Sequence, residues 1–257
     1  MTTAYDRLKT ARNTARPTGR AYVHELFRDR MDLCGDRRFG EDPAILSGIG
    51  TLQGRPVTYI AIDKGVDLDS RMSNHFGCPM PEGYRKALRL MKQAEKFHRP
   101  VICFVDTLGA YCGAEAEERG QGEAIAENIL EMMGLRTPVI SVVIGEGGSG
   151  GALALAVADR VWMLENAVYS VISPEGCASI LWKDPAKTRE AAQSLRLTAE
   201  DLRGFGVIER IFPEETGLFE QLAGALEETF AELSRMETAD LLEARYLKYR
   251  KLGAGIT

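Results

Sequence analysis

The sequence predicts an α/β fold built around a largely parallel sheet. Short apolar runs alternate with segments whose apolar residues recur every three or four positions, the pattern of strands that take turns with helices. The runs contain few polar residues, as expected for strands buried on both faces of a parallel sheet. Several begin directly after a proline. The predicted strands are Val57–Ile62, Val101–Val105, Val139–Ile144, Arg160–Leu164, Val168–Ile172 and Val207–Phe212.

Before the first predicted strand, residues 1–38 have the composition of a charged helical segment, and a turn is expected at Gly40–Pro43. Basic residues cluster in this segment, but acidic residues are interleaved with them, which favours a solvated helical face over a nucleic-acid site. The basic residues are Arg12, Arg16, Arg20, Arg28, Arg30, Arg37 and Arg38.

Between the strands, apolar residues at helical spacing predict helices over Pro81–Phe97 and Glu115–Leu135. The C-terminal tail, residues 218–252, is also predicted to be helical. One side of this tail is apolar, so it should pack on this chain or on a partner.

Composition limits the classes of protein to which the chain can belong. Of its 257 residues, 45% are hydrophobic and 27% are charged, which is ordinary for a globular protein. No repeat or linker divides the chain, so we expect one domain over residues 1–257. A net charge of −5 gives no global attraction to nucleic acid or to an anionic membrane.

The expected location is the cytoplasm. No apolar run reaches the ~18 residues that a membrane span requires, and the first residues do not have the pattern of a signal peptide. The five cysteines are widely spaced and form no C-x-x-C pair, which indicates free thiols in a reducing compartment and no metal site in this chain.

The first candidate site is the glycine-rich segment that follows the strand Val139–Ile144. It reads I-G-E-G-G-S-G-G-A-L-A-L and leads into an Ala/Leu helix. Glycines let a main chain approach a ligand closely, and the amides at the start of a helix have no acceptor within the helix. The segment is therefore a candidate oxyanion hole, in which main-chain donors stabilise charge that develops during a reaction.

The second candidate site follows the strand Val101–Val105 and reads D-T-L-G-A-Y-C-G, with Gly109 and Gly113 as its glycines. It too leads into a helix. Loops at the carboxyl ends of neighbouring parallel strands can converge on one cleft.

The first segment is also compatible with three different roles. Gly145, Gly147 and Gly150 satisfy G-x-G-x-x-G, and Glu165 follows at the spacing of a dinucleotide-binding site. The helix after the glycines would be short, however, and the motif lies past the middle of the chain. Ser149 could be a nucleophile, but no partner for a triad is evident. Close packing of a helix on a strand is the alternative without a ligand.

Catalytic side chains are scarce. The histidines are His24, His75 and His98, and none has metal-ligand spacing. Loop-borne His75 is the least easily dismissed of them. The acidic residues Glu115, Glu117 and Glu118 fit the solvated first turn of a helix better than an acid–base role.

Four long motifs, in order, resemble the carboxyltransferase alpha-subunit family of bacterial acetyl-CoA carboxylase. They are P-E-G-Y-R-K-A-L-R-L-M from Pro81, G-A-E-A-E-E-R-G-Q from Gly113, the glycine-rich segment from Ile144, and Y-S-V-I-S-P-E-G-C-A-S-I-L-W from Tyr169. The resemblance extends from about Arg16 to the C-terminus. It implies a crotonase-like (ClpP/crotonase) spiral of ββα units with peripheral N- and C-terminal helices.

The resemblance also implies a function. The chain would help transfer a carboxyl group from carboxybiotin, borne on biotin carboxyl carrier protein, to acetyl-CoA, which gives malonyl-CoA for fatty acid biosynthesis. By motif matching, the amides of Gly150 and Gly151 would stabilise charge on the biotin ureido oxygen, and the ureido nitrogen would take the proton from acetyl-CoA. Further binding residues would be Gly147, Gly148, Ser149, Gly109 and Gly113.

The implied partner is a beta subunit that carries a zinc ribbon and most of the acyl-CoA site, in a two-alpha, two-beta assembly that works with biotin carboxylase. The sequence departs from the family at Leu108 and Cys112, where proline is usual. Because proline fixes φ, its loss puts the rigidity of this loop in question.

Three alternative functions compete with this one. A stand-alone crotonase-type acyl-CoA hydratase or decarboxylase would turn over without a partner, but it would require a placed Glu or His. A nicotinamide-binding oxidoreductase would bind its dinucleotide in a simple titration. A purely structural subunit is disfavoured by the paired glycine-rich segments.

Overall fold

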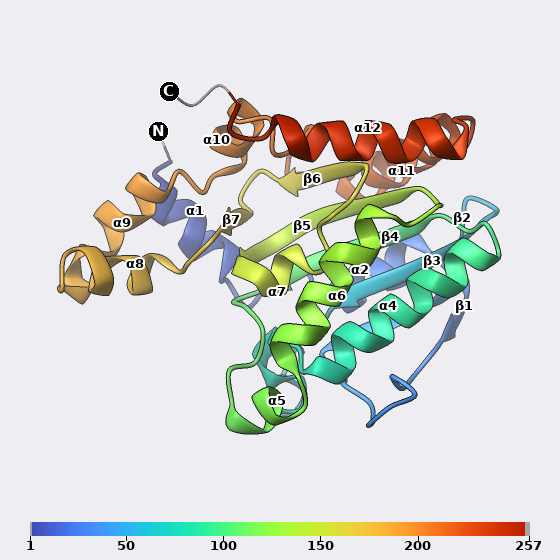
Figure 1. The fold of residues 1–257 in the computed structure, drawn as a ribbon. Helices are drawn as coiled ribbons and strands as arrows, with labels where there is room; N and C mark the ends of the chain where they lie inside the picture. The colour runs from blue at the N-terminus through green and yellow to red at the C-terminus, as the bar shows by residue number, and fades with distance from the viewer. Residues whose placement is uncertain (1, 255–257) are drawn as a thin grey trace.

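The computed structural model describes residues 2–254, which form one mixed eight-stranded sheet with helices on both faces (Figure 1). The strands are β1 (Arg28–Asp32), β2 (Ile45–Leu52), β3 (Arg55–Ile62), β4 (Val101–Thr107), β5 (Val139–Gly148), β6 (Arg160–Leu164), β7 (Val168–Ser170) and β8 (Arg210–Phe212).

The helices before β6 form two groups: the first two precede β1, and the others lie between β3 and β6 in the chain. They are α1 (Ala4–Ala11), α2 (Gly19–Leu26), α3 (Leu68–Ser73), α4 (Pro81–Lys96), α5 (Ala114–Glu118), α6 (Gln121–Met133) and α7 (Ser149–Leu153), with a 3-10 turn η1 (His75–Gly77). The later helices are α8 (Pro174–Leu181), α9 (Thr188–Leu195), α10 (Ala199–Gly204), α11 (Leu218–Leu233) and α12 (Thr238–Lys251), with a 3-10 turn η2 (Pro185–Lys187).

The strands follow the order β1-β2-β3-β4-β5-β6-β8, and β7 pairs with the far end of β5. Strand β2 is antiparallel to both of its neighbours, β1 and β3, and the remaining pairs are parallel. Every residue of β4 and β5 is buried, which explains why their sequences are almost continuously apolar. Each predicted strand overlaps an observed one, although the last two runs yield only the three-residue strands β7 and β8.

The predicted helical segment over residues 1–38 is wrong beyond Leu26. Residues Arg28–Asp32 form the edge strand β1, and β2, which was not predicted, lies between β1 and β3. All residues of β1 are exposed. Charged side chains protect an exposed sheet edge from pairing with other chains, so the charges of this segment belong to an edge strand rather than to a helix.

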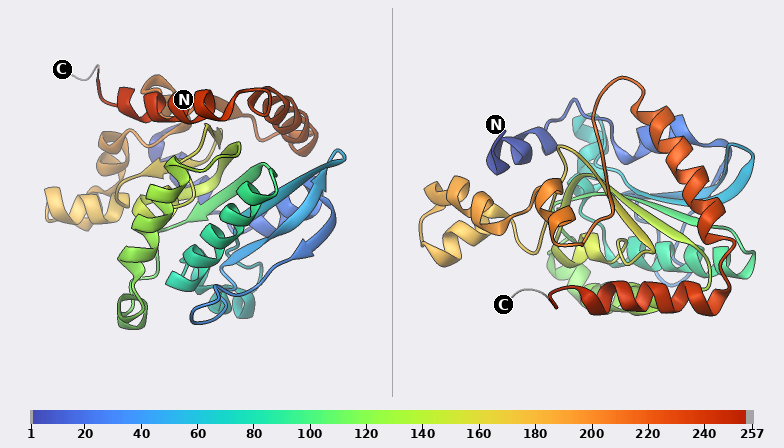
Figure 2. Two further views of the ribbon diagram at one scale, coloured as in Figure 1. Left: turned by 45° about the vertical axis from the view of Figure 1, so that its right-hand side comes forward. Right: turned by 90° about the horizontal axis from the view of Figure 1, so that it is seen from above.

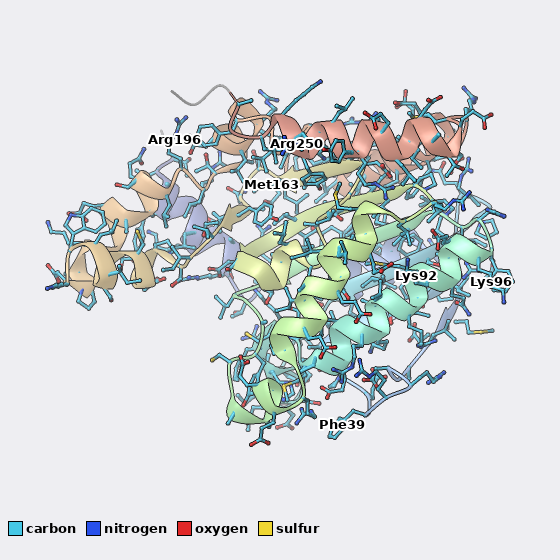
Figure 3. The ribbon with its side chains drawn as sticks, viewed as in Figure 1. Phe39, Lys92, Lys96, Met163, Arg196 and Arg250 are labelled. Carbon is cyan, nitrogen blue, oxygen red and sulfur yellow. The ribbon has the colours of Figure 1, made fainter. Side chains whose placement is uncertain are left out.

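Helices α4 and α6 cover the front of the sheet in Figure 1, and α2 lies behind it. Helix α4 buries Tyr84, Ala87 and Met91, while Lys92 and Lys96 lie on its outer side (Figure 3). The helix predicted over Glu115–Leu135 is divided into α5 and α6 at Gly120, whose φ of +81° interrupts the helix.

The C-terminal tail forms α11 and α12, which lie along the top of the molecule in the orientation of Figure 1 (Figures 1 and 2). Its apolar side packs on this chain, since Leu222, Leu226, Phe230 and Leu233 belong to the main core. Helices α8 and α9 project from the sheet at the left of Figure 1, and α1 packs against α9.

Candidate active site

The two glycine-rich segments meet at the carboxyl ends of β4 and β5, which are parallel neighbours. A Cβ atom added to Gly148 would lie 2.0 Å from the carbonyl oxygen of Leu108, and one added to Gly151 would lie 2.4 Å from the amide nitrogen of Ala110. Both distances are shorter than any ordinary contact, so the two main chains can approach this closely only because these residues are glycines. The convergence expected from the sequence is therefore present.

Helix α7 begins at Ser149, immediately after β5. Ser149 is exposed and has a φ of +49°, a conformation uncommon for a residue other than glycine. The amides of Gly150 and Gly151 lie in the first turn of α7, where amides have no acceptor within the helix. On the other side, the Tyr84 hydroxyl of α4 donates a hydrogen bond to the carbonyl of Gly151 at 3.1 Å. The turn is thus held by α4, and the helix itself does not use these two donors.

The loop after β4 is restrained by side chains. The Thr107 hydroxyl accepts a hydrogen bond from the Gly109 amide at 3.0 Å and donates one to the Gly109 carbonyl at 2.7 Å. Gly109 has a φ of +152°, which favours glycine. The Tyr111 amide donates to the Pro79 carbonyl at 3.0 Å, and Gln121 Nε2 donates to the carbonyls of both residues.

These bonds restrain the loop without the two prolines that the resemblance implied at the positions of Leu108 and Cys112, both of which are exposed. Gly113 lies at the far end of the loop, where it is the N-cap of α5. The atoms nearest to it belong to the side chains of Tyr111 and Glu115. A role for Gly113 in ligand binding stays a prediction.

The remaining glycines of the first segment serve packing. Gly147 pairs with Thr107 of β4 and with Tyr169 of β7. A Cβ atom at Gly145 would lie 2.3 Å from the Asp106 carboxylate. Helix α7 has five residues, and the Glu165 carboxylate accepts a hydrogen bond from a main-chain amide at 2.9 Å. Close contacts within the chain therefore account for the first two glycines of the G-x-G-x-x-G pattern, Gly145 and Gly147.

A cavity of about 640 Å³ lies beside the turn. Its lining, among the described residues, includes Leu108 and Glu146 on either side of the turn but neither Gly150 nor Gly151. The sequence did not single out the charged residues of this lining as site residues. These charged residues are Arg12, Arg16, Lys64, Arg71, Asp106, Glu146 and Glu175.

Arg12 forms the main ion-pair network of the cavity wall. Its Nε and Nη2 atoms donate to the Glu146 carboxylate at 2.9 and 2.7 Å, and its Nη1 atom donates to the Glu175 carboxylate at 2.7 Å. These bonds raise the pKa of Arg12, and the bond from Arg12 lowers the pKa of Glu175. Both groups are therefore charged at neutral pH.

The basic residues near the N-terminus do not form the solvated helical face that the sequence favoured. Arg12 is the C-cap of α1, and Arg16 and Arg20 lie outside α1. Arg16 pairs with Glu214, and Arg20 pairs with Asp63. Their partners are more than 40 positions away, so local spacing gave no signal for these contacts.

The side chains weighed as acid–base candidates lie elsewhere. Glu115, Glu117 and Glu118 are exposed on α5, and His24 and His98 are also exposed.

His75 packs on the Tyr111 ring with centroids 4.9 Å apart. Its Nδ1 atom is buried and has no hydrogen-bond partner among residues 2–254.

Metal clusters and membrane spans are both missing from the part of the chain that the structure describes. Between residues 2 and 254, no group of three or more His, Cys, Asp or Glu side chains could hold a metal ion. Within the same range, no helix is both long enough and apolar enough to cross a membrane.

The fold and the converging strand ends define the class: an α/β protein with the architecture of crotonase-like carboxyltransferases. The chain superimposes on transcarboxylase 12S, solved with methylmalonyl-coenzyme A bound, with a TM-score of 0.71 at 20% identity, over 88% of this chain and 44% of that longer one. A Pseudomonas malonate decarboxylase hetero-tetramer in complex with coenzyme A gives a TM-score of 0.67 at 18% identity, over 81% and 86% of the two chains. These likenesses show the fold.

The chain belongs to the acetyl co-enzyme A carboxylase carboxyltransferase-like family, whose model matches residues 1–253. Acetyl-coenzyme A carboxylase carboxyl transferase subunit alpha of Ruminiclostridium cellulolyticum is 55% identical over 254 residues, which are 97% of this chain and 98% of the relative. The protein of that name from Clostridium acetobutylicum is 54% identical, over 98% and 94% of the two chains. A Clostridium tetani chain named subunits beta/alpha is 52% identical; the match covers 97% of this chain and 45% of that one.

Proposed function

We propose that this chain is the alpha subunit of an acetyl-CoA carboxylase carboxyltransferase and that it works on the carboxybiotin side of the reaction that converts acetyl-CoA to malonyl-CoA. The proposal rests on family membership together with one observation. The glycine-rich ends of β4 and β5 meet, and the amides of Gly150 and Gly151 lie in the first turn of α7.

The residues of the turn suit a neutral, polar ring system such as biotin. Carboxybiotin, when bound, supplies the carboxyl group to be transferred, and its ureido oxygen gains negative charge as that group leaves. The amides of Gly150 and Gly151 would donate hydrogen bonds to this oxygen, so they would stabilise the transition state more than the ground state. Main-chain donors remain in place whatever the pH, which accounts for the scarcity of catalytic side chains in this chain.

The neighbouring glycines would shape the binding surface. The Leu108–Ala110 loop is packed against Gly148 and Gly151, so it fixes the position of the two donors. Gly147, Ser149, Gly109 and Gly113 are proposed to contribute backbone along the same edge.

A beta subunit would complete the site. The cavity beside the turn is open and has exposed apolar residues on its wall, namely Phe76 and Leu108. Further exposed apolar residues occur on the adjoining segments, at Val66, Leu68, Met72, Val171, Ile180, Leu181 and Trp182. Exposed apolar surface of this kind is typical of a protein interface. The beta/alpha name of the Clostridium tetani chain supports a beta-type partner.

We further propose that this partner holds the zinc ion and most of the acyl-CoA site. The assembly would contain two chains of each kind, receive its biotin from biotin carboxyl carrier protein, and operate with biotin carboxylase in the cytoplasm.

The test is a back-transfer assay, in which malonyl-CoA carboxylates biocytin, with this chain and the beta subunit encoded in the same genome. We expect acetyl-CoA to form only when both chains are present. Formation by this chain alone, or hydration of an enoyl-CoA by this chain alone, would instead support a stand-alone crotonase-type enzyme. A titration with NAD(H) that shows no binding serves as the control for the dinucleotide alternative.

A further inference from the structure

The turn that bears Gly150 and Gly151 is preceded by an irregular stretch of β5. Val105 pairs with Val143 and Thr107 pairs with Gly147, so Asp106 alone faces Ile144, Gly145 and Glu146. The stretch from Ile144 to Glu146 is thus a bulge with more residues than its partner strand. Glu146 pairs with Val168 of β7, but the stretch has no regular pairing with β4, so side chains from elsewhere must help to determine its conformation.

Side chains on two sides of the bulge supply that support. Asp106 accepts a hydrogen bond from the Glu146 amide at 2.8 Å, and Lys64 pairs with Asp106 at 2.6 Å. On the N-terminal side, Arg16 Nη2 donates to the Ile144 carbonyl at 2.7 Å. The main chain of the bulge is therefore held at both ends.

Arg12 holds the side chain of Glu146, the last residue of the bulge. The side chain of Glu146 is 7% exposed, and that of Arg12 is 32% exposed on the cavity wall. Arg12 also binds Glu175 in the first turn of α8, so one guanidinium joins the end of β5 to the start of α8. A buried carboxylate that loses its cation is strongly disfavoured, so without Arg12 the bulge should move to hydrate Glu146.

The fold itself does not depend on this contact. Helix α1, whose C-cap is Arg12, packs through Leu8 and other apolar residues against Val168, Ala192 and Leu197. The ion pair of Arg12 with Glu175 is open to solvent, because the Glu175 side chain is 46% exposed. Loss of Arg12 should therefore disturb the bulge while leaving the packing of α1 in place.

We propose that Arg12 is a positioning residue for carboxyl transfer: by clamping Glu146 and Glu175, it holds the bulge that directs the Gly150 and Gly151 amides. This inference rests on the proposed function of that turn. Arg12 acts through the main chain and does not contact the reacting groups. The N-terminal segment is thereby part of the catalytic architecture rather than a peripheral helix.

The experiment measures back-transfer by the alpha–beta complex with Arg12→Ala and Arg12→Lys chains. Arg160→Ala is the matched control, because the Arg160 side chain is also 32% exposed and pairs with Glu232 at 2.8 Å. We expect Arg12→Ala to lower kcat about 10²-fold, the order of loss for a reacting geometry displaced by ~1 Å, with KM for both substrates nearly unchanged. The kcat of the Arg12→Lys complex should lie between those of the Arg12→Ala and unsubstituted complexes. Lysine keeps the positive charge, but it has no planar fork with which to bind two carboxylates.

Chemical rescue separates positioning from a merely structural role. The space vacated in Arg12→Ala opens into the cavity, so guanidinium chloride in the millimolar range should restore part of the lost rate. Sodium chloride at equal ionic strength should not. Thermal unfolding and complex formation are measured on the same samples and should match those of Arg160→Ala.

Two results would overturn the inference. One is an Arg12→Ala rate equal to that of Arg160→Ala. The other is a loss of rate that follows loss of folded complex and is not rescued by guanidinium. Failure of the proposed function has a different signature, because the unsubstituted complex would then show no back-transfer at all.

Discussion

The anchor of α12 and the turn between β5 and α7 both fix a chain segment against the sheet, but they do so by opposite means. At the anchor, the buried Arg245 guanidinium makes two hydrogen bonds of 2.8 Å to the Asp159 carboxylate. It also donates to the carbonyls of Met132, Leu135 and Thr137. A single side chain therefore joins α12 to the end of α6 and to the residues that lead into β5 and β6.

At the turn, main chain packs on main chain. Gly148 and Gly151 lie directly on the main chain of the Leu108–Ala110 loop. An anchor built from a charge pair uses all its polar groups internally. Contact through glycines leaves the amides of the turn available to a ligand. Substitutions should therefore affect mainly stability at the anchor and mainly rate at the turn.

The largest expected effect on stability is at the anchor. Arg245→Met leaves the Asp159 carboxylate, which is 2% exposed, without its cation. We expect the free energy of unfolding to fall by about 3–5 kcal/mol, as measured by urea denaturation of the full chain. The double variant Arg245→Met with Asp159→Asn should lose less free energy of unfolding than the two single variants lose in sum. A loss below about 1 kcal/mol, the range of surface ion pairs, would mean that α12 is not anchored by this pair.

The largest expected effect on rate is at the turn. Gly150→Pro removes one amide donor from the first turn of α7. We expect kcat of the alpha–beta complex to fall by about 10²–10³, equivalent to ~3 kcal/mol.

Gly150→Ala is the matched control. It keeps the amide, and its Cβ atom would lie 3.6 Å from Ile125, an ordinary contact. Equal rates for the proline and alanine variants, with equal thermal midpoints, would exclude the Gly150 amide as a donor.

A smaller effect on stability, one that depends on pH, is expected at Asp36. The carboxylate of this residue accepts hydrogen bonds from main-chain amides of its loop. Burial alone would raise the pKa of Asp36, but hydrogen bonds from the amides of Arg38, Phe39 and Gly40 and from Arg85 lower it to about 2. Since the pKa is lowered in the folded chain, this stabilisation is present above pH 3.8 and is lost as the pH falls toward 2.

Asp36→Asn should therefore cost about 2 kcal/mol at pH 7, and the difference from the unsubstituted chain should vanish near pH 2. Phe39 lies at the tip of this loop (Figure 3), with the Arg119 guanidinium 4.4 Å from its ring centroid. Phe39→Leu is the control for simple loosening of the loop, and its effect should not depend on pH. If the loss of stability depended on pH in the same way for Asp36→Asn and Phe39→Leu, the Asp36 carboxylate would be ruled out as the source of that dependence.

The smallest expected effect is at Tyr84, the side chain that supports the turn from α4. Tyr84→Phe removes the hydrogen bond to the Gly151 carbonyl and should destabilise the chain by about 1 kcal/mol. It should also lower the rate of back-transfer, because the carbonyl belongs to the same turn as the donors. If stability falls while the rate does not change, the turn holds its geometry without α4.

The sequence was most informative where structure depends on neighbours in the chain. The apolar runs predicted the buried strands β3, β4, β5 and β6, since a strand covered on both faces has no place for polar side chains. The periodicity from Pro81 predicted α4 to within one residue. Glycine-rich strand ends predicted where the two loops meet.

The sequence was least informative where contacts join distant positions. Charged residues in β1 resembled a helical face because charge pattern alone does not distinguish an exposed helix from an edge strand. The partners of Arg12 and Arg245 are far along the chain, so no local pattern pointed to them. Glu146 and Glu175 were visible within the glycine-rich and S-P-E-G motifs, but their ion pairs were not.

The sequence by itself therefore determined the fold class, the central strands and the two glycine-rich segments, because hydrophobic pattern and glycine content act through local geometry. Only the tertiary structure decided which charges support those segments. The ion pairs of Arg12 and Arg245, and the hydrogen bond from Arg16 to the Ile144 carbonyl, form only when the sheet brings their partners within about 3 Å. Burial strengthens electrostatic interactions at that distance.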